Sequence, residues 1–373
     1  MNITTISRLW SDKRTLWVFY TVAAVFVSIQ KYGQPSKYEG YTAYENYVIF
    51  RNSFAHLWSG QNPYAAFPAE QWDLFKYSPA FALFMAPFSV LPDLIGLMVW
   101  NLLNALPLLA ALWMLPLKND QQKAVVAWVI LVELVISLQN SQSNGLTAAL
   151  MIGTLVALER KKYWMGAAAV AGAAFIKVFG IVAVLLCLFY PRKWSFLFKL
   201  SIVCLVLLLI PLVVVSPAHL WQVYQWWWQL LQQDHVASIG LSVQGFLQVW
   251  FDWQPSKMAI TVFGVIVLLG SIAAATRQHP RSTDQAKYPL LVLASILIWV
   301  VIFNHKAESP TFIIAMSGVM LWYCSGGQSR WDQALTLLAL IFVSLSPSDL
   351  FPRFIRDQYM QPYVVKVIPC ILI

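Results

Sequence analysis

The segment Asn-His-Lys-Ala-Glu-Ser-Pro, at 304–310, places His305, Lys306 and Glu308 together directly ahead of an apolar run. An imidazole and an ammonium group can bind a phosphate, and a neighbouring carboxylate can donate or accept a proton. These residue types in one short segment predict a phosphate-binding and acid–base cluster. A solvated loop that carries ordinary surface charges is the alternative interpretation of the same residues.

Lys177 interrupts the apolar run 163–189. An ammonium group that is removed from water costs roughly a few kcal/mol unless an anion compensates its charge. We therefore expect Lys177 to meet a negatively charged group. The alternative is that its long side chain reaches back to the membrane surface.

A polar loop, residues 31–78, separates the first apolar run from the next, and its middle part has the periodicity of an amphipathic helix. The apolar positions of that helix are Tyr47, Ile49, Phe50, Phe54, Leu57 and Trp58. Gly60 and Pro63 follow, and a glycine with a proline beyond it typically ends a helix. We expect this helix to lie on the membrane.

Charged residues flank this helix at Glu45, Glu70, Asp73 and Lys76. Aromatic and charged side chains also anchor ordinary membrane proteins in the headgroup region. The loop therefore predicts either a polar site at the lipid–water boundary or a set of interface anchors.

The composition excludes a soluble domain, because only 11% of the 373 residues are charged and 59% are hydrophobic, whereas about a quarter of a soluble domain is charged. We predict an all-α polytopic transmembrane bundle that forms one integral unit over residues 1–373. The net charge of +9 comes from short basic clusters at the ends of apolar runs, as in cytoplasmic loops, so nucleic acid is not an expected partner. The four cysteines have no close spacing and predict neither a disulfide framework nor a thiolate metal site.

The apolar runs predict ten to twelve membrane crossings, and several runs are shorter than the ~20 residues of a perpendicular span, which indicates tilted or paired half-spans. The runs are 15–30, 79–91, 94–117, 124–138, 145–158, 163–189, 195–216, 258–276, 288–303, 309–324, 331–346 and 363–373.

The basic residues predict the orientation. Arg8, Lys13 and Arg14 precede the first run, so we expect a cytoplasmic N-terminus and an outer loop at 31–78. We also expect the protein to lie in a bacterial plasma membrane. Basic clusters at both ends of 163–189 favour a short hairpin there, with Lys177 at its outer tip, over a single span. The Trp- and Gln-rich stretch 216–235 predicts a helix lying in the membrane interface.

Short motifs give a resemblance to a known family. Gly-Gln-Asn-Pro-Tyr at 60–64, Lys-Tyr-Ser-Pro at 76–79, Ser-Gln-Ser-Asn at 141–144, the Lys177 segment and the Glu308 segment occur in one order along the chain. This pattern resembles the polytopic glycosyltransferases of the GT-C class, specifically glycosyltransferase family 87. The resemblance implies transfer of a hexosyl or pentosyl unit from a polyprenyl-phosphate sugar donor to a lipid or glycan acceptor at the outer membrane face.

Such a reaction requires a carboxylate base and donors for the departing phosphate. The candidate bases are Glu45, Asp73 and Glu308, with Glu39 and Glu70 as the other carboxylates near the outer face. The candidate binding residues are Asn46, Lys76, Tyr77, Lys177, His305 and Lys306. No cofactor or metal is expected, because the donor carries no nucleotide diphosphate and the chain shows no Asp-x-Asp motif or His/Cys cluster outside.

One position departs from the family pattern. The family has an Asp about fourteen residues before the loop glycine, where this chain has Asn46, and an amide cannot act as that base. Glu45 is adjacent but points about 100° away on a helix. A catalytically inactive relative that binds a lipid-linked glycan therefore stays open as an alternative. Independently of this position, a secondary transporter is the main rival of the enzyme.

Overall fold

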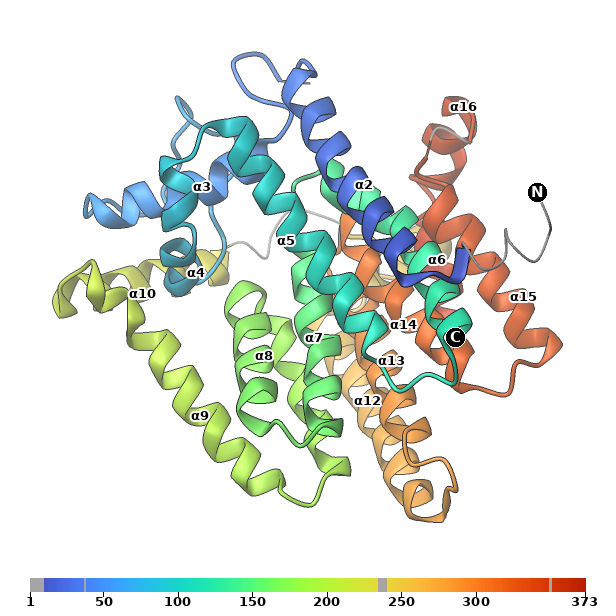
Figure 1. Ribbon diagram of the computed structural model, residues 1–373. Helices are drawn as coiled ribbons and strands as arrows, with labels where there is room; N and C mark the ends of the chain where they lie inside the picture. Colours follow the sequence, from blue (N-terminus) through green and yellow to red (C-terminus); the bar gives the residue numbers. More distant parts are fainter. Residues whose placement is uncertain (1–9, 37, 234–239, 349–350) are drawn as a thin grey trace.

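The computed structural model describes residues 10–36, 38–233, 240–348 and 351–373, and within these ranges it consists of helices and one isolated β-bridge between Pro35 and Thr42 (Figure 1). This confirms the predicted all-α fold. Arg8 and residues 234–235, which entered the predictions of orientation and of the interface helix, lie outside the described residues.

Four helices in the described ranges are long and apolar enough to cross a membrane. They are α5 (Asp93–Trp113), α6 (Asp120–Gln139), α9 (Lys193–Leu209) with its 3₁₀ extension Ile210–Val213, and α12 (Lys257–Gln278). Shorter apolar helices lie among them: α7 (Asn144–Glu159), α8 (Tyr163–Ile176), the 3₁₀ helix Val178–Phe189, α13 (Lys287–Ile302) and α14 (Phe312–Ser325) with its preceding 3₁₀ turn Ser309–Thr311.

Two of the long helices expose apolar side chains to the outside of the bundle. On α9, Phe198 and Leu205 are more than half exposed, and on α12 the same holds for Phe263 and Ile266. In a membrane these faces contact lipid, where exposed apolar surface carries no penalty. The two helices lie at the periphery in Figure 1, while α7, α13 and α14 lie in its interior.

The hairpin predicted at 163–189 is present. The helix α8 ends at Ile176, and the chain turns back at Lys177 into the 3₁₀ helix Val178–Phe189, which packs against α8. A Cβ at Gly180 would lie 2.5 Å from the backbone carbonyl carbon of Ala173, so the two arms are close enough that only glycine fits at this contact.

The outer loop contains α3 (Glu45–Trp58), and Gly60, with φ +74°, directly follows the cap of this helix, as the sequence predicts. The apolar face of α3 packs on the protein itself, against α4 (Pro79–Phe84), the 3₁₀ turn Ala86–Val90 and α5. The expectation that it lies on the membrane is therefore replaced by a helix that is largely buried. Tyr47 shows the reason, because its hydroxyl fills the space that a Cβ at Gly96 of α5 would occupy.

The remaining elements surround this core. The run 79–91 forms only the short α4 and the following 3₁₀ turn, and thus a half-span. The other helices are α2 (Lys13–Gly33), α10 (Pro217–Gln233), α11 (Val243–Phe251), the 3₁₀ turn His279–Arg281, α15 (Arg330–Ala339), the π-helical segments Leu340–Leu345 and Arg356–Met360, α16 (Arg353–Ile355), the 3₁₀ turn Val365–Val367 and α17 (Ile368–Leu372).

The close packing of α13 on α14 generates a stability prediction. A Cβ at Gly318 would lie 2.6 Å from the Ala294 carbonyl oxygen, so Gly318→Ala forces two backbones apart. We expect a loss of about 1–3 kcal/mol, measured as a lower midpoint of thermal unfolding in detergent. Gly270→Ala is the matched control, because Gly270 lies on α12 with no atom within 4 Å of such a Cβ, and its midpoint should stay level or rise. Equal losses in both variants would contradict the packing argument.

Candidate functional site

Three segments that are distant in sequence meet at the end of the bundle that carries α3. The Tyr77 hydroxyl donates to Oε1 of Gln142 (3.4 Å) and accepts from the Ser143 hydroxyl (3.3 Å). The Ser78 hydroxyl caps α4 and donates to the carbonyl of Phe175 (2.5 Å) at the tip of the hairpin. The outer loop, the start of α7 and the hairpin tip are thereby joined.

Lys177 lies at the centre of this junction. Its Nζ donates to Oδ1 of the fully buried Asn144 (2.6 Å), while the Asn144 side-chain NH₂ has no hydrogen-bond partner within the described part of the chain. The charge of Glu308 acts on Lys177 from nearby. The site therefore holds a desolvated ammonium group and an amide donor without a partner, both of which suit an anionic ligand.

Glu308 lies near the same junction. Its charge acts on both Lys177 and Tyr77, and it raises the pKa of Tyr77 further, after burial and together with Asp73. The side chain of Glu308 is exposed, and within the described residues its carboxylate has no hydrogen bond or ion pair. It is thus an accessible carboxylate at a cationic site.

Asp73 and Lys76 form an ion pair at the edge of the junction, with Oδ2 and Nζ 3.0 Å apart and both side chains about one-third exposed. The other oxygen of Asp73 accepts the backbone N–H of Leu74 (2.7 Å). Trp227 of α10 donates its indole N–H to the carbonyl of Lys76 (3.3 Å), so this helix packs against the loop that carries the pair.

The carboxylate of Glu45 is held by hydrogen bonds from two parts of the outer loop. One of its oxygens accepts from the backbone N–H and hydroxyl of Thr42 (3.3 and 3.2 Å), and the other accepts from the backbone N–H of Trp72 (3.1 Å). Its side chain is almost fully buried. The neighbouring Asn46 donates its amide to the carbonyl of Asn140 (2.9 Å), which attaches α3 to the end of α6. Glu45 thus joins two parts of the outer loop, and Asn46 attaches the loop to the bundle.

His305 and Lys306 lie in the loop that leads to Glu308, and both are partly buried. The loop is held through its backbone, because the carbonyls of His305 and Ala307 accept from the N–H groups of Gly240 (3.0 Å) and Leu241 (2.8 Å). A Cβ at Gly240 would lie 2.3 Å from the His305 carbonyl oxygen, so the contact requires glycine.

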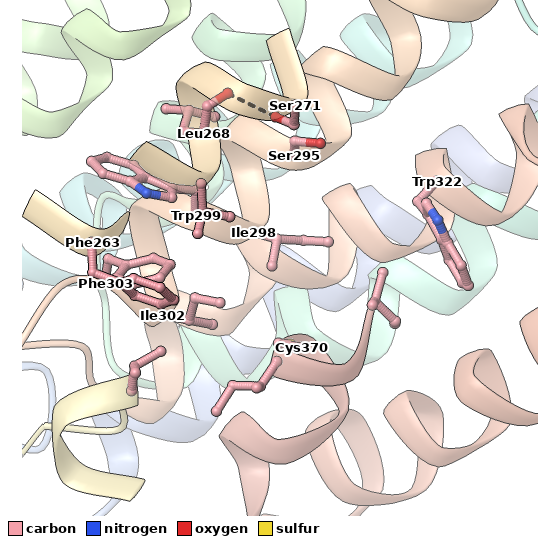
Figure 2. Close-up of a pocket in the computed structure, with 14 residues that line it drawn as sticks. Phe263, Leu268, Ser271, Ser295, Ile298, Trp299, Ile302, Phe303, Trp322 and Cys370 are labelled. Carbon is pink, nitrogen blue, oxygen red and sulfur yellow. Dashed lines mark hydrogen bonds between the residues drawn. The ribbon is translucent and has the colours of Figure 1, made fainter. Parts of the chain in front are cut away.

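An apolar pocket of about 400 Å³ adjoins this loop (Figure 2). It lies among α11, α12, α13, α14 and α17, and Ile302 and Phe303, which line it, directly precede Asn304–Glu308. Figure 2 shows Phe263, Trp299 and Phe303 on one side of it and Trp322 on the other.

Three polar groups along this pocket donate hydrogen bonds to helix carbonyls. The hydroxyls of Ser271 and Ser295 donate to the carbonyls of Leu268 and Leu291, and the Trp299 indole donates to the carbonyl of Gly264. The pocket thus presents an apolar surface that ends beside a charged loop.

Several ionic contacts were not anticipated from the sequence. Arg51 pairs with Asp93, His56 Nε2 lies 3.0 Å from Glu70, and Glu133 of α6 pairs with Lys366 inside the bundle. Glu133 and Lys366 each interrupt an apolar run, and a charged residue in such a run is itself a signal of function. Among the described residues, no three or more His, Cys, Asp or Glu side chains group in a way that could hold a metal ion.

The helices and this charged junction define an integral membrane protein with a polar site at one end of its bundle. Residues 75–347 match the model of glycosyltransferase family 87, which covers more than half of the chain, so the chain belongs to that family and is a membrane glycosyltransferase. The match confirms the resemblance seen in the sequence motifs, and α3 lies ahead of the matched residues.

Among solved structures, the chain is similar to ArnT from Cupriavidus metallidurans bound to undecaprenyl phosphate. The identity is 11%, the alignment covers 95% of this chain and 75% of that chain, and the TM-score is 0.41. No curated protein matches the chain.

Proposed function

We propose that the protein transfers a hexosyl or pentosyl unit from a polyprenyl-phosphate sugar to a hydroxyl group of a lipid or glycan acceptor, at the outer face of a bacterial plasma membrane with the N-terminus in the cytoplasm. The observation that carries the proposal is the hydrogen-bonded pair of Lys177 and Asn144, whose side-chain NH₂ has no partner among the described residues, together with the exposed Glu308 nearby and an apolar pocket that adjoins the Glu308 loop. A cation for the phosphate, a base for the hydroxyl and an apolar space for a lipid chain are the three parts that this reaction needs.

In the proposed reaction the acceptor oxygen attacks the anomeric carbon of the sugar. The bond from that carbon to the phosphate oxygen breaks, and its electron pair leaves with the polyprenyl phosphate. Lys177 and the unpaired NH₂ of Asn144 bind the phosphate and stabilise the charge that develops on it, with Lys306 and His305 on the facing loop. The hydroxyl proton passes to a carboxylate.

Glu308 is the base that the contacts favour. Its carboxylate is exposed and has no partner among the described residues, whereas Glu45 accepts three hydrogen bonds and Asp73 pairs with Lys76. The oxygens of Glu45 and Asp73 are already engaged by these partners, whereas those of Glu308 can accept the proton of an acceptor hydroxyl. This choice also accounts for Asn46, because a base on the facing loop makes a carboxylate at that position unnecessary.

The pocket of Figure 2 is the proposed site for the proximal isoprene units of the donor. Its apolar lining ends at Ile302 and Phe303, so a chain that lies in it would bring its phosphate to the loop of His305 and Lys306. Burial of the chain would contribute about 0.8 kcal/mol per methylene group.

The first test uses the purified protein with polyprenyl-phosphate sugars and measures the release of polyprenyl phosphate. Glu308→Gln keeps the side-chain volume but removes the base, so we expect kcat to fall about 10²- to 10⁴-fold with little change in the donor KM. Glu70→Gln is the matched control, because Glu70 is also a half-exposed carboxylate of the outer loop but pairs with His56.

Full activity of Glu308→Gln would exclude Glu308 as the base, and Asp73→Asn would then be examined. Absence of transfer by the unaltered protein over a panel of sugars and acceptors would contradict the proposed reaction itself. Uptake of substrate into sealed vesicles would instead support a transporter.

The pocket gives a separate prediction about donor length. Val267 of α12 is about half exposed and lines the pocket, so Val267→Trp should fill part of it. We expect the KM for a long-chain donor to rise about tenfold, while the KM for a donor with a single isoprene unit stays within about twofold. Ile266→Trp is the control, because Ile266 is exposed on the same helix but does not line the pocket. An equal effect of both variants, or none on the long donor, would contradict this placement of the chain.

A further inference from the structure

A buried ion pair connects the C-terminal segment to the interior of the bundle. The Nζ of Lys366 lies 3.1 and 3.3 Å from the two carboxylate oxygens of Glu133, which is fully buried on α6. The side chain of Lys366 is itself 6% exposed. Two charges that are removed from water in this way persist only when the geometry satisfies both of them.

Lys366 makes further contacts in addition to this ion pair. Its Nζ also donates to the carbonyl (3.2 Å) and the hydroxyl (3.0 Å) of Ser309, and it lies 5.0 Å from the centre of the Phe312 ring. The ammonium group therefore has contacts on every side, and two of its hydrogen bonds end on one residue of the Ser309–Thr311 turn.

That residue follows Glu308 directly in the chain. Glu308 is the cap residue of the turn, and its own side chain makes no capping bond. The position of its carboxylate is consequently set by the backbone of Ser309 on one side and by the contacts of His305 and Ala307 with Gly240 and Leu241 on the other.

We propose that Lys366 and Glu133 are positioning residues, which hold Ser309 so that the carboxylate of Glu308 faces Lys177. The charged pair binds neither donor nor acceptor. It fixes the turn, so the C-terminal segment 353–373, which carries no candidate base, forms part of the catalytic machinery. The assignment of a catalytic consequence rests on the proposed function.

The alternative is that the pair only stabilises the fold, and removal of one partner alone does not separate the two roles, because it leaves a buried charge unpaired. The double variant Glu133→Gln/Lys366→Met removes both charges at nearly constant volume, and such a replacement is often neutral for stability. It also removes both hydrogen bonds to Ser309. Lys366→Arg is the conservative variant, since a guanidinium group can reach both Glu133 and Ser309.

The kinetic test compares these variants with the unaltered full-length protein in the polyprenyl-phosphate release assay. For the folded double variant we expect kcat to fall at least about tenfold with a donor KM within about twofold, because the phosphate site at Lys177 is untouched. Lys366→Arg should retain kcat within about threefold. A double variant with full kcat would overturn the proposal, as would a decrease of activity that only follows the loss of folded protein.

A second measurement does not depend on turnover. Glu308→Cys gives an exposed cysteine for a trifluoromethyl label, whereas three of the four native cysteines are buried. With the ion pair intact we expect one narrow fluorine resonance, and with Glu133→Gln/Lys366→Met a broadened or split one. A label at Glu39→Cys, in the distant part of the outer loop, should not respond.

These two readouts separate the possible failures. An unchanged resonance in the double variant would overturn the positioning role even if the protein transfers sugar. The resonance could instead change in a protein that transfers sugar from none of the donors. That result would support the positioning of Glu308 by the ion pair and reject the proposed function.

Discussion

The cost of moving a charge from water into an apolar interior governs the arrangement of this protein. A chain with so few charged residues places each interior one beside a partner, and the partners come from distant parts of the sequence. Lys177 donates a hydrogen bond to Asn144 and lies near the charge of Glu308, and Glu133 forms an ion pair with Lys366. The remaining fold can be described as the set of helices that brings these groups together without exposing them to lipid.

The local features of the fold follow from local signals. A lysine between two apolar stretches with basic residues at both ends predicts a hairpin, and the turn is found at Lys177. A glycine after an amphipathic run predicts a helix end, and Gly60 has the left-handed backbone that such an end favours. The lengths of the helices were less predictable, because 79–91 is apolar enough for a span but folds as two short pieces. Pro87, at the start of the second piece, cannot continue a helix from α4, and Phe81 and Phe88 pack on Trp100 of α5.

The residue types of the site could be predicted from the sequence, but the contacts of these residues could not. The carboxylates and cations named from the sequence lie at one end of the bundle, but only the tertiary structure distinguishes their surroundings. Glu45 looked like the substitute for a missing aspartate, yet its hydrogen bonds include one to Trp72, 27 residues further along the chain. Glu133 and Lys366 are 233 residues apart. Each is a charged residue in an apolar run, but nothing in the sequence indicates that the two form an ion pair.

The shortness of the hairpin has a consequence for the membrane around it. The 14 residues of α8 extend about 21 Å at 1.5 Å per residue, whereas the hydrocarbon core of a bilayer is about 30 Å thick. A helix that starts at the basic residues 160–162 on one surface therefore ends roughly 9 Å below the other. Either the bilayer is locally thin at the hairpin or water follows the polar junction inward. In both cases a substrate headgroup would have to descend below the general plane of the lipid headgroups, which would admit molecules anchored in the membrane more readily than those dissolved outside it.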